Sequence, residues 1–207
     1  EPIERVIVEV PQEYLGVTME LLGERKGELV DMNQVGPDEV RAEFTVPARG
    51  LIGFHSLFLT ETKGLGVLHH TFHGYAPHRG PLPERPNGSL VAWETGTVTA
   101  YACENIQERG QLFVSPGDEV YAGMIVGAHN RPQDLDVNIC KKKHVTNMRS
   151  STAEIDVKLD PPRTFTVEQA LSYIAADELV EVTPKHVRMR KVILDRNQRA
   201  ALRKGVR

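Results

Sequence analysis

The pattern of apolar and polar positions in the first third of the chain predicts six regular elements. In order they are a strand, a helix, two strands, a helix and a strand, at residues 3–10, 11–25, 28–35, 40–46, 51–58 and 67–72. The order βαββαβ is that of the split-βαβ arrangement, in which two helices cover one face of a four-stranded antiparallel sheet. We therefore expect an α+β, ferredoxin-like domain over residues 1–78.

A segment rich in proline and glycine follows this region. Residues 79–88, RGPLPERPNG, contain three prolines and two glycines, which disfavour helices and central strands. We expect a linker at 79–88 and a second domain at 89–207.

The second domain is expected to be mixed and mostly β, with a few helices. Its apolar pattern predicts strands at 89–94, 97–103, 120–126, 135–139, 155–159 and 186–191, and helices at 105–109, 167–175 and from about 196. Thr166 and Gln169 form a T-x-x-Q capping box at the start of the second of these helices. We interpret the carboxylates of residues 177–181 as solvated groups on the surface of a helix.

A basic segment without acidic residues lies between two of the predicted strands. It runs from Lys141 to Ser151, KKKHVTNMRSS, and strands 135–139 and 155–159 flank it, so we expect a loop that projects from a rigid base. Clustered cations repel one another unless a polyanion neutralises them, and phosphate is the commonest such partner. The pattern indicates nucleic-acid binding, and a merely solvated charged loop is the alternative.

Charge is distributed unevenly along the chain, although its total is only −3. Residues 184–207 contain nine Lys and Arg against Asp195 alone, a net charge of +8, so the preceding residues carry −11. An acidic body with a basic end is expected of a protein that binds RNA in one orientation. A second candidate basic surface consists of Lys185, Arg188, Arg190 and Lys191. The alternative is that these side chains only cover the acidic residues 177–181.

Length, hydropathy and cysteine content are those of an ordinary cytoplasmic protein. A chain of 207 residues with 40% hydrophobic content can form two small cores. No apolar run approaches the ~20 residues of a membrane span, and no secretory leader is visible. Two isolated cysteines, Cys103 and Cys140, suit a reducing compartment and are expected to be buried or half-buried. We expect a cytoplasmic monomer without a membrane partner, and the start at Glu1 suggests part of a longer protein.

Motifs for catalysis or cofactor binding are missing from the sequence. There is no G-x-x-x-x-G-K-[ST], G-x-S-x-G or C-x-x-C, so we predict no catalytic residue and no nucleoside-triphosphate site in this chain. A metalloprotein is an alternative because of the cluster His69, His70, His73 and His78. We predict no metal site, because a strand would separate His70 from its neighbours and no nearby cysteine completes a tetrahedral site.

Several short motifs resemble translational GTPases related to elongation factor G. The opening residues 1–3, 8–11, 13–14 and 25–27 (EPI, VEVP, EY and RKG) are similar to the fifth domain of those proteins. Later stretches look specifically like the C-terminal domain of the BipA/TypA branch: TNMRSS at 146–151, EQAL at 168–171, DELVEVTP at 177–184 and RMRK at 188–191. The resemblance spans essentially the whole chain. Departures at 144–145 and 187–189, and the histidine cluster, leave the basic character of the loop unchanged.

The resemblance implies a ribosome-associated GTPase concerned with translation under stress and with large-subunit assembly. GTP and Mg²⁺ would bind a domain that this chain lacks, and the chain itself would carry no cofactor. The implied partners are the ribosome, large-subunit rRNA and the tRNA acceptor end. The implied RNA-binding residues are Lys141, Lys142, Lys143, His144, Asn147, Arg149, Ser150 and Ser151, of which the cations would neutralise phosphates. A self-contained RNA-binding module without GTPase function is the remaining alternative.

Overall fold

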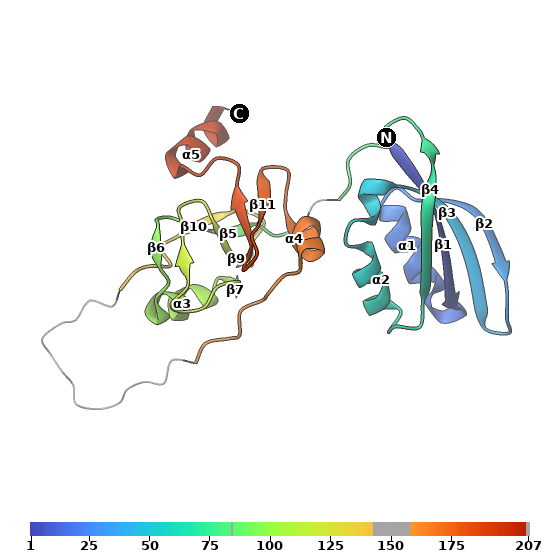
Figure 1. Cartoon of the computed structure of the whole chain (residues 1–207), viewed down its shortest axis with the longest axis horizontal. Coiled ribbons are helices and arrows are strands. Elements are labelled where there is room, and N and C mark those ends of the chain that lie inside the picture. Colours follow the sequence, from blue (N-terminus) through green and yellow to red (C-terminus); the bar gives the residue numbers. More distant parts are fainter. Residues whose placement is uncertain (84, 143–157, 206–207) are drawn as a thin grey trace, which may run out of the picture. The chain divides into compact units, whose positions relative to one another are not determined.

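The computed structural model describes residues 1–83, 85–142 and 158–205. The chain divides into two compact units, residues 1–84 and 85–207 (Figure 1). The division falls inside the segment 79–88. In the described part of the chain, no helix has the length and apolarity that a membrane crossing requires.

The first unit has the ferredoxin-like architecture that the sequence predicts. Its elements are β1 (Pro2–Pro11), the 3-10 helix η1 (Gln12–Tyr14), α1 (Leu15–Glu24), β2 (Glu28–Gln34), β3 (Glu39–Pro47), the 3-10 helix η2 (Ala48–Leu51), α2 (Phe54–Glu61) and β4 (Val67–Tyr75). The sheet order is β2-β3-β1-β4, with every pair antiparallel. Both helices lie on one face of the sheet (Figure 1).

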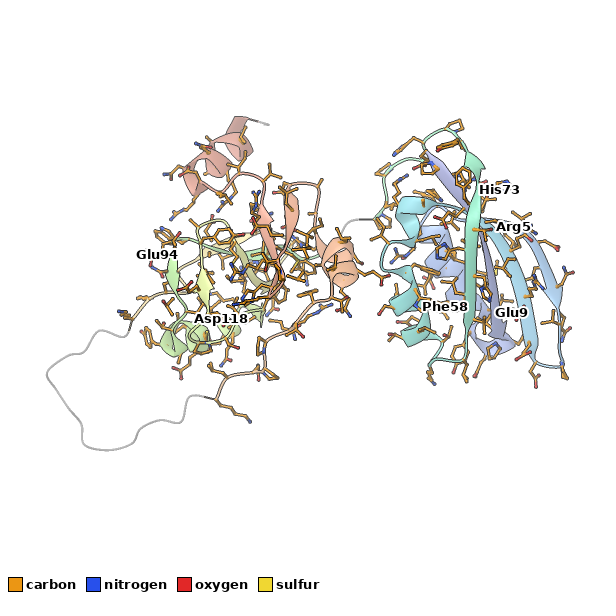
Figure 2. All side chains as sticks on the ribbon, in the orientation of Figure 1. Arg5, Glu9, Phe58, His73, Glu94 and Asp118 are labelled. Carbon is orange, nitrogen blue, oxygen red and sulfur yellow. The ribbon has the colours of Figure 1, made fainter. Side chains whose placement is uncertain are left out.

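The core of the first unit follows from the alternation along β1. Val6, Val8 and Val10 are buried, and they pack with Phe54 and Phe58 of α2. Figure 2 shows Phe58 on α2, and it shows Arg5 and Glu9 at odd-numbered positions of β1. Because successive side chains of a strand point to opposite faces, the even positions from Val6 to Val10 supply the core and the odd positions between them face away from the helices.

The second unit is mixed and mostly β, as predicted. Its strands are β5 (Ser89–Ala92), β6 (Gly96–Thr97), β7 (Gly110–Leu112), β8 (Glu119–Val120), β9 (Ile125–His129), β10 (Leu135–Val137), β11 (Glu178–Val182) and β12 (Val187–Lys191). Its helices are α3 (Ala100–Gln107), α4 (Val167–Tyr173) and α5 (Arg196–Gly205). A sheet of order β10-β5-β9-β7 holds the main core, and β11-β12 and β6-β8 form two-stranded sheets.

Three predictions for the second unit are wrong. Of residues 97–103, only Thr97 lies in a strand, at the end of β6, because Thr99 caps helix α3 and its side chain accepts a hydrogen bond from the Ala102 backbone. Residues 120–126 form parts of two strands, because Gly123 has a φ of +86° and breaks the run between β8 and β9. Residues 178–182 form strand β11 rather than the surface of a helix.

Other predictions for the second unit are confirmed. The capping box at α4 is present, with Thr166 and Gln169 bonded reciprocally to each other's backbone. The strand at the basic end and the final helix also form, as β12 and α5. Cys103 is buried and Cys140 half-buried, and burial raises the pKa of the Cys103 thiol to about 11. The predicted strand 155–159 lies mostly outside the described residues, and 158–160 form no strand.

Two arginines fix the ends of the proline-rich segment, each within its own unit. The Arg79 guanidinium donates to the Thr45 and Lys26 carbonyls at 2.7 and 3.0 Å, inside the first unit. The Arg85 guanidinium donates to the Tyr173 carbonyl at 3.0 Å and to Glu178 at 2.5 Å, inside the second unit. The segment 79–88 is therefore tied to the folded units near both of its ends.

Candidate nucleic-acid interface

Helix α3 anchors both ends of the stretch that contains the basic loop. Before the loop, the Thr99 hydroxyl donates to the Lys141 carbonyl at 2.6 Å, and the Thr99 amide donates to the Ile139 carbonyl at 3.1 Å. After the loop, the Gln107 side chain donates to the Lys158 carbonyl at 3.1 Å and accepts from the Asp160 amide at 3.2 Å. Thr99 and Gln107 stand at opposite ends of α3, whose eight residues span roughly 12 Å.

Only two of the predicted loop residues lie in the described part of the chain. Lys141 and Lys142 are exposed, and neither forms an ion pair with a carboxylate among the described residues. The other six lie outside the described residues: Lys143, His144, Asn147, Arg149, Ser150 and Ser151. The two lysines at the start of the loop are thus open to an external anion.

The second candidate basic surface is only partly at the surface. Lys185 is exposed and Arg188 half-exposed, and neither pairs with a carboxylate in the described part of the chain. Arg190 donates to Glu181 at 2.6 Å, and the other oxygen of Glu181 accepts from the Tyr121 hydroxyl at 2.5 Å. The alternative weighed for these residues, that they cover nearby carboxylates, therefore holds for Arg190.

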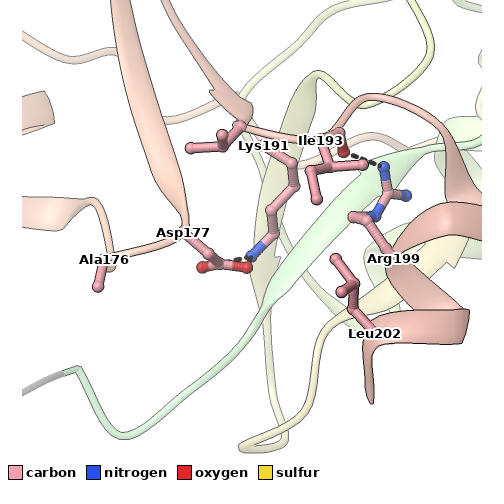
Figure 3. Close-up of a pocket in the computed structure, with 7 residues that line it drawn as sticks. Ala176, Asp177, Lys191, Ile193, Arg199 and Leu202 are labelled. Carbon is pink, nitrogen blue, oxygen red and sulfur yellow. Dashed lines mark hydrogen bonds and ion pairs between the residues drawn. The ribbon is translucent and has the colours of Figure 1, made fainter. Parts of the chain in front are cut away.

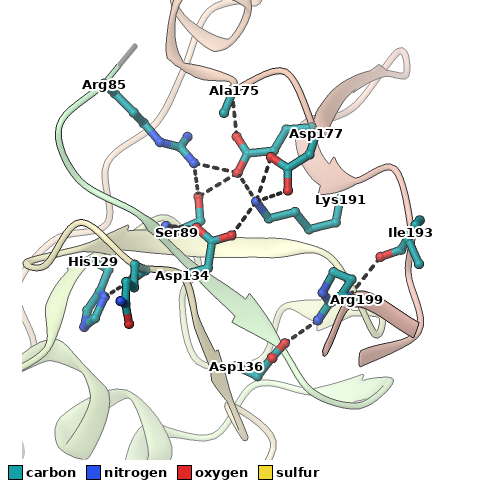
Figure 4. Close-up of polar contacts among 12 residues, drawn as sticks. Arg85, Ser89, His129, Asp134, Asp136, Ala175, Asp177, Lys191, Ile193 and Arg199 are labelled. Carbon is teal, nitrogen blue, oxygen red and sulfur yellow. Dashed lines mark hydrogen bonds and ion pairs between the residues drawn. The ribbon is translucent and has the colours of Figure 1, made fainter. Parts of the chain in front are cut away.

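The surface assignment is wrong for Lys191, which is 1% exposed. Its Nζ atom lies 2.6 Å from Asp134, 2.9 Å from Asp177 and 2.8 Å from Glu178 (Figure 4). Strand β12 turns this side chain inward, since Lys191 shares a face with the buried Met189. A buried ammonium surrounded by carboxylates is a structural group and is closed to an external phosphate.

Glu178 joins Lys191 to Arg85 in one buried ionic network (Figure 4). The Glu178 carboxylate also accepts from the Ala175 amide at 2.9 Å and from the Ser89 hydroxyl at 3.1 Å. Burial alone would raise the pKa of Glu178, but the hydrogen bonds from Arg85, Lys191 and Ala175 outweigh it and lower this pKa. For Lys191, burial opposes the charge, yet its three carboxylate partners raise the pKa of the ammonium.

Two more arginines of the basic end are also engaged within the chain. Arg199 of α5 is 7% exposed, donates to the Ile193 and Leu194 carbonyls at 2.9 and 2.6 Å, and pairs with Asp136. Figure 3 shows Arg199 beside Lys191 around a cavity of about 340 Å³. The Arg196 guanidinium lies over the Trp93 ring, 4.2 Å from its centroid. Part of the +8 charge therefore stabilises the second unit instead of being free for a ligand.

The histidine cluster does not form a metal site in the structure. His69, His70, His73 and His78 are all described, and no group of three or more potential metal ligands comes together among the described residues. His70 contacts Glu4 through Nδ1, and His78 Nδ1 accepts from the Gly80 amide at 3.1 Å. His73 lies on the edge strand β4 (Figure 2). The geometry gives no support to the metalloprotein alternative.

Comparison with known proteins first defines the class of the chain. Residues 1–86 match the family described as elongation factor G C-terminus, and residues 87–196 match the family described as TypA/BipA C-terminal domain. The first match, on a ferredoxin-like unit, places the chain among proteins that share the C-terminal part of elongation factor G. The second match covers more than half of the chain. The chain belongs to the TypA/BipA family.

Individual relatives agree with this assignment. The protein named large ribosomal subunit assembly factor BipA from Bacillus subtilis (strain 168) is 48% identical over 200 residues, which are 96% of this chain and 33% of the relative. The protein of that name from Escherichia coli (strain K12) is 46% identical over the same shares. A putative elongation factor TypA-like SVR3, chloroplastic, from Arabidopsis thaliana is 47% identical over 92% of this chain and 28% of the relative. The chain thus spans about a third of the length of these relatives.

Proposed function

We propose that this chain is the ribosome-binding portion of a TypA/BipA-type translational GTPase that acts in large-subunit assembly and in translation under stress. Its ligands are large-subunit rRNA and the tRNA acceptor end, and its contact is the loop 141–151. Two relatives carry the name large ribosomal subunit assembly factor, which supports the ribosome as partner. GTP hydrolysis, with its Mg²⁺, belongs to the whole protein and lies outside these residues.

The observation that carries the proposal is the unpaired charge at the start of the loop. Lys141 and Lys142 are exposed without a carboxylate partner in the described part of the chain, whereas buried cations of the same unit, such as Lys191, are fully paired. Two adjacent ammonium groups attract a phosphate more strongly than one, and the phosphate in turn reduces the repulsion between them. The anchoring of both loop ends to α3 holds these charges on a rigid element, which favours a defined contact.

The remaining loop residues complete the proposed contact. Lys143 and Arg149 would neutralise further phosphates, and His144, Asn147, Ser150 and Ser151 would donate or accept hydrogen bonds with phosphate, the ribose 2′-hydroxyl or base edges. Lys185 and Arg188 form the part of the second basic surface that stays available. We further propose a cytoplasmic monomer, in keeping with a ribosomal partner.

The test replaces Lys141, Lys142, Lys143 and Arg149 together by Ala and measures co-sedimentation with the large ribosomal subunit. We expect binding to weaken and its salt dependence to flatten, because each lost phosphate contact removes roughly 0.7–0.9 from the log–log slope. Thermal unfolding should stay unchanged, since the two described lysines are exposed.

A charge-conserving variant provides the matched control. Replacing the three lysines by Arg keeps the cations, so binding should persist. Unaltered co-sedimentation of the Ala variant would exclude the loop from the mechanism. The alternative of a self-contained RNA-binding module predicts that ribosome association of the whole protein does not respond to guanine nucleotides, and that experiment separates the two functions.

A further inference from the structure

Two cavities lie along helix α3, one beside the helix and one beside its C-terminal end. The first, of about 270 Å³, is lined by Trp93, Tyr101, Asn105, Arg109, Asn138 and Lys141, among others. The second, of about 570 Å³, is lined by Arg109, His129, Asn130 and Arg131, among others. Arg109 belongs to both cavities, and β10 borders both. Because they share Arg109, we treat the two cavities together and call their combined lining the α3 groove.

The lining of the groove includes an aromatic ring, an amide and a cation at intervals of four residues. Tyr101, Asn105 and Arg109 are spaced four residues apart, so they follow one face of α3 and its extension. The Asn105 amide donates to the Tyr101 carbonyl at 2.5 Å and is otherwise exposed. Asn138 and Lys141, in the segment that follows β10, also line the groove. Such a combination of π-face, hydrogen-bonding amide and cation suits a nucleotide better than a purely charged ligand.

Trp93 offers a second stacking surface in the same groove. Trp93 is 50% exposed, and the Arg196 guanidinium lies over its ring, 4.2 Å from the centroid. The cation–π contact stabilises the position of the ring, and the residue stays accessible to a ligand. Base–aromatic stacking needs only a free ring surface and tolerates any base, because every base has a π-face.

The charge along the groove suits a polyanion. Lys141, Arg109 and Arg131 form no ion pairs with carboxylates in the described part of the chain. Asp136 also lines the groove, but Arg199 neutralises it. Glu108, in the second cavity, is the remaining acidic group of the lining. The three free cations outnumber this carboxylate, so the groove has a net positive charge.

We propose that the α3 groove binds single-stranded RNA. Unpaired bases stack on Trp93 and on Tyr101, the amides of Asn105 and Asn138 form hydrogen bonds with base edges, and the backbone phosphates lie along Lys141, Arg109 and Arg131. A duplex is excluded because its bases are stacked on one another and present no free face. This inference rests on the proposed function, which it deepens by adding a site for exposed nucleotides beside the start of the loop.

The chain contains a single tryptophan, so the fluorescence of Trp93 reports directly on this groove. We expect a short single-stranded oligoadenylate to quench it saturably when it is added to the chain of residues 1–207. Inorganic polyphosphate, which has the charge but no base, and polyglutamate, which stands for an acidic protein partner, should leave the fluorescence unchanged. Equal quenching by either polyanion, or no quenching by RNA, would overturn the proposal.

Variants on the exposed face of α3 test the assignment of roles. Tyr101→Ala should weaken oligoadenylate binding at least about fivefold, whereas Tyr101→Phe, which keeps the ring, should bind as the parent does. Arg109→Ala should reduce the salt slope by roughly 0.7, as expected for one contact to a single strand. Asn105→Ala changes an exposed side chain and should weaken binding without altering thermal unfolding. Full binding by all three Ala variants would refute the groove.

The two proposals fail in different ways. The fourfold loop variant tests the ribosome contact by co-sedimentation, whereas Arg109→Ala and Tyr101→Ala test the groove with free RNA. Loss of ribosome binding in the loop variant, combined with unchanged oligoadenylate binding in the groove variants, would refute only the groove. Quenching by RNA in a protein whose loop variant still sediments with the large subunit would refute only the loop contact.

Discussion

Some charged residues of the second unit are buried and paired within the chain, whereas others are exposed and open to a ligand. Lys191 is enclosed by three carboxylates, whereas Lys185, six positions earlier, is exposed and unpaired in the described part of the chain. The sequence predicts both as surface cations because they share one basic stretch. It could not reveal the burial of Lys191, since Asp134, more than fifty positions away, supplies part of its surroundings.

Replacing Lys191 by Met should strongly destabilise the second unit. The substitution leaves Glu178, Asp134 and Asp177 facing one another without the ammonium, and loss of one partner of a buried pair costs about 3–5 kcal/mol. Chemical denaturation measures this loss. Lys185→Met, at the exposed position, should change the free energy of unfolding by no more than about 0.5 kcal/mol. Equal effects of the two substitutions would contradict the structure.

Stability should fall in acid partly through Glu178. Its pKa in the folded protein lies below the ordinary value of 4.5, so its contribution is complete above pH 4.5 and is lost as the pH falls towards the lower folded-state pKa. Urea unfolding as a function of pH measures this slope. Glu178→Gln should show a flatter dependence below pH 4.5, and parallel curves for the two proteins would show that Glu178 contributes nothing.

At the scale of elements, apolar alternation predicts the first unit well and the second less well. Long strands such as β3, Glu39–Pro47, give a clear period of two. The sequence predicts only the end of helix α3, at 105–109, and assigns its first half to a strand, whereas the cap at Thr99 and the buried positions Ala102, Cys103 and Ile106 define the whole helix. Recognising that cap would also have aligned Tyr101, Asn105 and Arg109, and with them the α3 groove.

Gly110 tests the pairing of β7 with β9. Gly110 directly follows the helix predicted at 105–109 and begins β7, where an added Cβ would lie 1.8 Å from the Ala128 carbonyl oxygen. Gly110→Ala should therefore destabilise the protein by more than about 2 kcal/mol, because two backbones must separate. Gly16→Ala in α1 has open space around its Cβ and should stabilise by about 0.5–1 kcal/mol. Thermal unfolding of both variants measures the contrast.

On the scale of the whole molecule, the two units have separate hydrophobic clusters among the described residues. The first unit has the cluster of Val6 and Phe58, and the second has the cluster of Leu90 and Val126 and a smaller one of Ile125, Ala170 and Met189. Such units unfold as separate cooperative bodies when few contacts connect them. The proline-rich composition of 79–88 predicts a linker, but the anchoring of Arg79 and Arg85 depends on distant carbonyls that no local pattern shows.

Calorimetry of two variants tests this independence. Arg79→Ala removes donors to the Thr45 and Lys26 carbonyls and should lower only the transition of the first unit. Arg85→Ala removes one of the cationic partners of Glu178 and should lower only the transition of the second unit. Shifts of several °C are expected, since 1 kcal/mol moves the midpoint of a small domain by roughly 4–8 °C. A common shift of both transitions in either variant would contradict separate unfolding.

The network of Arg85, Glu178 and Lys191 gives the second unit a distinctive response to warming. The hydration free energy of ions becomes less favourable as temperature rises, so burying these charged groups costs less free energy. The stabilisation by apolar contacts, in contrast, reaches a plateau. The buried charges consequently support the fold more effectively in hot solution than in cold. Cells growing near the upper end of their thermal range would gain the most from keeping all three side chains.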